Sequence, residues 1–119
     1  MSEQTQDPRD LVKPLIIVEF EDRVIELKEN QETKELDMNE LIPILFGTEQ
    51  VGLLYVKNPT VYPYLITFLE FADPAITLDK FDPHILPQKE KAIRFTILTE
   101  VTRKRPVDTR LKLDGGYTI

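Results

Sequence analysis

The chain has 119 residues, of which 41% are hydrophobic and 30% charged, and its formal net charge at pH 7 is −6. This length and composition predict a single globular domain and exclude an intrinsically disordered chain. Cysteine is absent, which excludes disulfides, thiolate metal sites and cysteine nucleophiles. The sequence contains neither an apolar stretch long enough to span a bilayer nor the features of a secretory signal, so we expect a cytoplasmic protein without membrane contact.

Charge is unevenly distributed along the chain. Residues 1–50 carry 13 acidic and 5 basic side chains, a net charge of −8, whereas residues 51–119 carry 8 acidic and 10 basic ones, a net charge of +2. The basic excess is concentrated in residues 89–112. Such an asymmetry is typical of proteins that bind an anionic partner or associate with a second charged surface.

The first part of the chain divides into a tail and a predicted hairpin. Residues 1–13 are polar and lack periodicity, which predicts a flexible N-terminal tail before a single domain over residues 14–113. Residues 15–20 and 24–28 are rich in β-branched side chains and predict a β-hairpin, with one long bent strand as the alternative. The expected inward-facing residues are Ile16, Val18, Phe20, Ile25 and Leu27.

A helix and a central strand are predicted next. Asp37 and Glu40 match a capping box and Gly47 a C-terminal cap, which predicts a helix between them. Residues 51–57 are apolar on both faces, and this pattern favours a strand in the middle of a sheet.

A second helix is predicted over residues 60–72. Thr60 is a suitable N-cap, and the polar residues that follow form only a narrow stripe at helical spacing. Tyr64, Ile66 and Phe68 also alternate, so a strand is the alternative for this segment.

The rest of the chain predicts extended structure. Two Asp-Pro turns lie in residues 72–87, a strand follows over 92–102, a shorter strand over 107–113, and 114–119 forms a flexible end. The predicted fold class is therefore α+β: a mostly antiparallel or mixed sheet of about five strands, with two helices packed on one face.

The sequence offers little for catalysis or metal binding. His84 is the only histidine, and turn formation already explains the nearby residues Asp73, Asp79 and Asp82. The only serine is Ser2, in the predicted tail, so no Ser-His-acid constellation is expected. We therefore expect a non-enzymatic protein without a metal or cofactor.

Association with another protein is the leading functional hypothesis. The predicted helix over residues 60–72 has more apolar surface than one sheet face normally covers, and aromatic side chains are favoured at interfaces. A central helix that is covered wholly within the monomer is the alternative for this segment. The candidate contact residues are Tyr62, Tyr64, Phe68 and Phe71. The chain would then be an adaptor, assembly factor or accessory subunit that binds a protein partner or forms a homodimer.

Nucleic-acid binding through residues 89–112 is the alternative. Clustered cations there suit phosphate contacts, although the overall acidity works against them. The candidate anion-binding residues are Arg103, Lys104, Arg105, Arg110 and Lys112. A small enzyme or a ligand-binding protein is the third hypothesis.

Overall fold

The computed structural model describes residues 13–30, 32–33, 35–38 and 44–118. The predicted tail, apart from Lys13, therefore lies outside the described residues, as do residues 39–43 of the first predicted helix.

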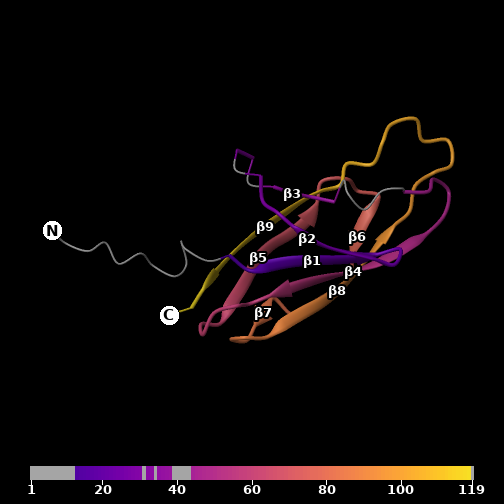
Figure 1. The fold of residues 1–119 in the computed structure, drawn as a ribbon. Coiled ribbons are helices and arrows are strands. Elements are labelled where there is room, and N and C mark those ends of the chain that lie inside the picture. The colour runs from indigo at the N-terminus through magenta and orange to yellow at the C-terminus, as the bar shows by residue number, and fades with distance from the viewer. Residues whose placement is uncertain (1–12, 31, 34, 39–43, 119) are drawn as a thin grey trace.

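The described chain is all-β, with nine strands in two antiparallel sheets (Figure 1). Sheet A has the strand order β2-β1-β4-β8-β6, and sheet B has the order β3-β9-β5-β7. The strands are β1 (Leu15–Phe20), β2 (Arg23–Leu27), β3 (Leu36–Asp37), β4 (Gln50–Lys57), β5 (Tyr64–Phe71), β6 (Ile76–Leu78), β7 (His84–Ile85), β8 (Glu90–Ile97) and β9 (Arg110–Tyr117). Since no helix occurs among these residues, the predicted α+β class is wrong.

The predicted hairpin is confirmed as β1 and β2. Phe20 pairs with Arg23 across a two-residue turn, in which Glu21 and Asp22 have φ angles of 50° and 64°. Positive φ at both central residues is typical of a type I′ turn, whose twist matches that of the flanking strands. The inward-facing residues are buried as predicted, apart from Ile25, which is partly buried.

The predicted central strand is confirmed as β4, which lies between β1 and β8. The core lies between the two sheets, where Phe95 of β8 contacts two other rings. Its centroid is 5.9 Å from that of Phe20 and 5.6 Å from that of Phe71, which belongs to sheet B. Phe95 therefore connects the two layers.

The predicted helix over residues 60–72 is wrong, and most of the segment forms β5. Tyr64 and Ile66 face the core, but the register against β9 shifts between Ile66 and Phe68. This β-bulge at Thr67 turns Phe68 outward, where it is 42% exposed, and returns Phe71 to the core. The bulge disrupts the strict alternation of a strand, which is why the segment also resembles a helix.

The predicted helix after Asp37 is also not observed in the described residues. Asp37 belongs to β3, and its carboxylate accepts a hydrogen bond from the Thr109 hydroxyl at 2.5 Å. Ile44 and Leu45, at the other end of the predicted helix, lie outside regular secondary structure. Asp37 thus pairs with β9 as part of a strand and does not act as the helix N-cap that the sequence predicts.

The C-terminal strand is displaced from its predicted range of residues 107–113, because β9 begins at Arg110, continues to Tyr117 and pairs with β5. Residues 114–117, expected in a flexible end, are therefore part of sheet B. A Cβ atom on Gly115 would lie only 2.5 Å from the Tyr64 hydroxyl, so the absence of a side chain lets this ring pack over β9.

Candidate functional site

The aromatic residues predicted to form an interface lie in different environments. Tyr64 and Phe71 are 6% and 3% exposed and belong to the core, while Tyr62 is partly buried against it. Phe68 alone is well exposed, on the outer face of sheet B. The structure therefore does not bring these four rings together as one surface.

Arg103, a predicted anion-binding residue, forms a mostly buried ion pair within the chain. Its guanidinium donates to both carboxylate oxygens of Asp73, at 2.5 and 3.3 Å, and also to the carbonyls of Arg105 and Pro106. Burial alone would raise the pKa of Asp73, but hydrogen bonds from Arg103 and two backbone N–H groups outweigh it and lower the pKa to about 2. Arg103 thus anchors the loop between β8 and β9.

The other predicted cations differ in their partners. Arg110 donates to the carboxylate of Asp108 at 2.5 Å and lies 3.3 Å from that of Glu35. Lys104, Arg105 and Lys112 are exposed, and their side chains form no ion pair with the described residues. Two of the five candidates are therefore already neutralised by carboxylates of the same chain.

The carboxylates near His84 also form hydrogen bonds or ion pairs within the chain. Asp82 accepts from the His84 backbone N–H at 3.0 Å and lies 3.0 Å from its ring nitrogen, while Asp79 pairs with Arg94. Within residues 13–30, 32–33, 35–38 and 44–118, no three His, Cys, Asp or Glu side chains are grouped as metal ligands would be.

The outer surface of sheet A carries an apolar area that crosses its four longer strands. Residues of β1, β4 and β8 that alternate with the buried ones point outward, and Ile17, Tyr55 and Ala92 lie in one cross-strand row. We call this area the outer apolar face; it consists of Leu15, Ile17, Val24, Val51, Leu53, Tyr55 and Ala92.

This face is open to solvent in the single chain. Val24, Val51 and Leu15 are 62%, 45% and 41% exposed, and Leu53 and Tyr55 are half-buried. The sequence contains a signal for it, because residues 51–57 are apolar on both sides of the strand, but this pattern by itself predicts only a strand in the middle of a sheet.

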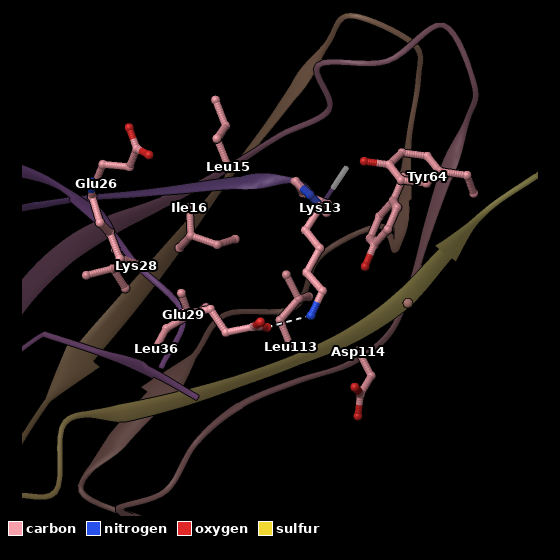
Figure 2. Close-up of a pocket in the computed structure, with 14 residues that line it drawn as sticks. Lys13, Leu15, Ile16, Glu26, Lys28, Glu29, Leu36, Tyr64, Leu113 and Asp114 are labelled. Atoms are coloured by element: carbon pink, nitrogen blue, oxygen red, sulfur yellow. Dashed lines mark hydrogen bonds and ion pairs between the residues drawn. The ribbon is translucent and has the colours of Figure 1, made fainter. Parts of the chain in front are cut away.

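A groove lies where β1 and β2 of sheet A meet β9 of sheet B (Figure 2). It has a volume of about 530 Å³. Lys13 extends from the start of β1 across the groove to Glu29, and the Nζ–Oε2 distance is 2.6 Å. Burial, together with the charges of nearby groups, raises the pKa of Tyr64 to about 12, so its hydroxyl in the wall remains protonated.

Comparison with protein-family models, with curated proteins and with solved structures found no match. Among the described residues, no helix has the length and apolar character needed to cross a membrane.

Proposed function

We propose that this chain is a non-enzymatic protein-association module that binds a second copy of itself through the outer apolar face. The observation that supports this proposal is the apolar character of β4 on both sides of the sheet. An antiparallel sheet with one solvated face normally directs polar side chains outward. Here β4 directs Val51, Leu53 and Tyr55 outward instead, next to Ile17 of β1.

The charges that flank Leu53 suit a second copy of the chain. Glu19, Leu53 and Arg94 lie in one row across β1, β4 and β8. A two-fold axis parallel to β4 would place β1 of one copy over β8 of the other. Glu19 would then face Arg94 of the second copy at both ends of the row, and Leu53 would face its own equivalent.

The same arrangement brings apolar residues together. In the next row Ile17 would face Ala92 of the second copy, and the two Tyr55 rings would meet near the axis. Aromatic residues at the centre of an interface commonly supply much of the affinity, while flanking charges mainly steer association. Arg94 already pairs with the exposed Asp79 at 3.0 Å, and Glu19 of the second copy would join this pair.

Sedimentation equilibrium of the wild-type chain and the Tyr55→Lys variant tests the proposal. We expect a concentration-dependent dimer of the wild type, and an association constant at least about tenfold lower for the variant. Phe68→Lys is the matched control, because Phe68 is an exposed aromatic residue on the other sheet and should leave association unchanged. A wild type that remains monomeric at every concentration would contradict the proposal.

A charge-reversal cycle tests the proposed orientation. Glu19→Arg and Arg94→Glu should each weaken the dimer, and the two changes combined should restore much of the association constant, since the ion pair is re-formed with opposite polarity. If the losses of association free energy in the two single variants simply add in the double variant, the arrangement with a two-fold axis parallel to β4 is excluded. We also propose that the chain is cytoplasmic, as expected from its sequence.

A further inference from the structure

Strand β9 has one edge that the described chain leaves largely open. On one side it pairs with β5 along its length, from Leu111 to Tyr117. On the other side β3 pairs only with Arg110 and Leu111. No strand among the described residues lies beside β9 on that side beyond Leu111.

The direction of the backbone groups follows from the hydrogen bonds at the two ends of β9. Met38 N–H donates to the Thr109 carbonyl on the β3 side, at 3.3 Å. Ala72 N–H donates to the Arg110 carbonyl at 2.8 Å, and Thr118 N–H to the Pro63 carbonyl at 2.8 Å, both on the β5 side. Because successive residues of an antiparallel strand direct these groups to opposite edges, Leu113, Gly115 and Tyr117 direct theirs to the open side.

The groove of Figure 2 lies along this open edge. Sheet A contributes Ile16 and Leu27, and sheet B contributes Leu36, Leu113 and the Tyr64 ring; these side chains form the apolar part of a lining that also contains charged groups. An added strand would therefore meet backbone groups that no described strand pairs at its edge, and both apolar and charged side chains in the groove.

We propose that the groove and the open edge of β9 form a strand-addition site for an extended peptide. The peptide would carry an apolar residue at every second position, facing the groove, with lysines between them. In strand addition of this kind, main-chain hydrogen bonds provide the affinity, and pockets that accept alternate side chains of the peptide provide the specificity.

The charges around the groove favour a basic peptide. Glu26, Glu29 and Asp114 line it together with Lys13 and Lys28, and Lys13 is already paired with Glu29. The whole chain carries a net charge of −6, which also attracts a cationic partner. The Lys13 side chain is 63% exposed and would have to move aside; an exposed ion pair of this kind offers little resistance.

Amide hydrogen exchange of the full-length ¹⁵N-labelled chain, followed by NMR, tests the site residue by residue. The probe is a capped peptide of about seven residues in which valine and lysine alternate. In the free protein the amides of Leu113, Gly115 and Tyr117 should exchange rapidly, whereas those of Lys112 and Asp114, which face β5, should be protected.

Saturation with the peptide should slow exchange at Leu113, Gly115 and Tyr117 by at least about tenfold. A peptide of the same composition in which valines and lysines are grouped in blocks is the control and should leave exchange unchanged. Absence of binding at millimolar peptide, or binding that leaves these three amides unprotected, would overturn the proposal. Protection in the absence of peptide would also overturn it, because the edge would then already be covered.

Matched variants separate this site from the proposed dimer. Leu113→Lys replaces an apolar contact in the groove with a cation that repels a basic peptide, and it should weaken peptide binding at least about tenfold. Gly116→Lys is its control, because a Cβ there meets nothing within 4 Å and residue 116 alternates with those facing the groove. Tyr55→Lys, which should disrupt the dimer, should leave peptide binding intact; loss of binding in that variant would contradict a separate site.

Discussion

Asn58 shows how a single buried polar side chain connects two loops. It is 2% exposed, and its amide nitrogen donates to the carbonyls of Tyr62, Ile85 and Leu86 at 2.7 to 3.3 Å. Its side-chain oxygen accepts from both the backbone N–H and the hydroxyl of Thr60, at 3.0 and 2.7 Å. The segment after β4 is thereby joined to the segment after β7.

Replacing Asn58 with alanine should lower the free energy of unfolding by about 3 kcal/mol, because carbonyls that are shielded from water lose their donor. Denaturant titration measures the change. Gln88→Ala is the matched control, since that amide makes one exposed bond to the Pro59 carbonyl at 3.2 Å and should cost less than about 1 kcal/mol. Equal costs for the two variants would show that the Asn58 network contributes no more than an exposed bond.

The buried pair of Asp73 and Arg103 makes stability depend on pH in the acidic range. Folding lowers the pKa of Asp73 from 3.8 to about 2, so the folded state favours the carboxylate. Its contribution of about 2 kcal/mol should be complete above about pH 4 and should be lost as the pH falls through about 2. Asp73→Asn should flatten this part of the stability curve and also destabilise the protein at neutral pH, because Arg103 is left without its partner.

Denaturant titrations at several pH values measure both effects. Asp79→Asn is the control, since Asp79 pairs with Arg94 at the surface, where both side chains are about half exposed. An Asp73→Asn variant with the same acid sensitivity as the wild type would contradict the assignment to this pair.

At the level of the element, β5 shows the effect of one inserted residue. The bulge at Thr67 places Tyr64 in the core and Phe68 in solvent, although the two residues are four apart and would share one face of a helix or of a regular strand. Tyr64→Ser should therefore destabilise by several kcal/mol, roughly 3 to 5, as truncations of buried aromatic rings do. Phe68→Ser should cost about 1 kcal/mol or less, because its ring is already 42% exposed. Thermal and denaturant unfolding of the pair gives the comparison, and similar losses would contradict the bulge.

The strands that sequence predicts correctly are those with regular alternation or a uniformly apolar character. The hairpin of β1 and β2, the central strand β4 and most of β8 belong to this group. The errors occur where a contact distant in sequence decides the conformation. Asp37 has the chemistry of a helix cap, but pairing with β9 makes it part of a strand, and the Gly-Gly segment that suggested a flexible end is ordered by β5.

The candidate surfaces could be predicted only in part. The double-sided apolar pattern of residues 51–57 indicated the outer apolar face, but the sequence does not show that the chain leaves one side of this strand uncovered. The groove beside β9 could not be predicted at all, because its lining combines the hairpin of β1 and β2 with Leu36, Tyr64 and β9, which lie far apart in sequence. Which residues share a surface depends on the order of the strands in each sheet, and local periodicity in the sequence does not determine that order.

At the level of the whole molecule, the distribution of charge argues against nucleic-acid binding. The net charge is −6, and Arg103 and Arg110 are paired with carboxylates of the same chain. Only Lys104, Arg105 and Lys112 remain of the five candidate phosphate contacts. The net negative charge of the chain also repels a polyanion at long range.

We therefore expect no appreciable binding of single- or double-stranded DNA or RNA at physiological salt, measured by fluorescence anisotropy with labelled oligonucleotides. The informative variant is the combined Lys104→Gln and Arg105→Gln change, because it removes exposed cations and leaves the Arg103 ion pair intact. Binding of the wild type that weakens steeply with salt and disappears in this variant would establish phosphate contacts in this loop. Binding that the variant does not alter would have to use other cations of the chain, and the loop between β8 and β9 would retain the structural role that Arg103 and Asp73 give it.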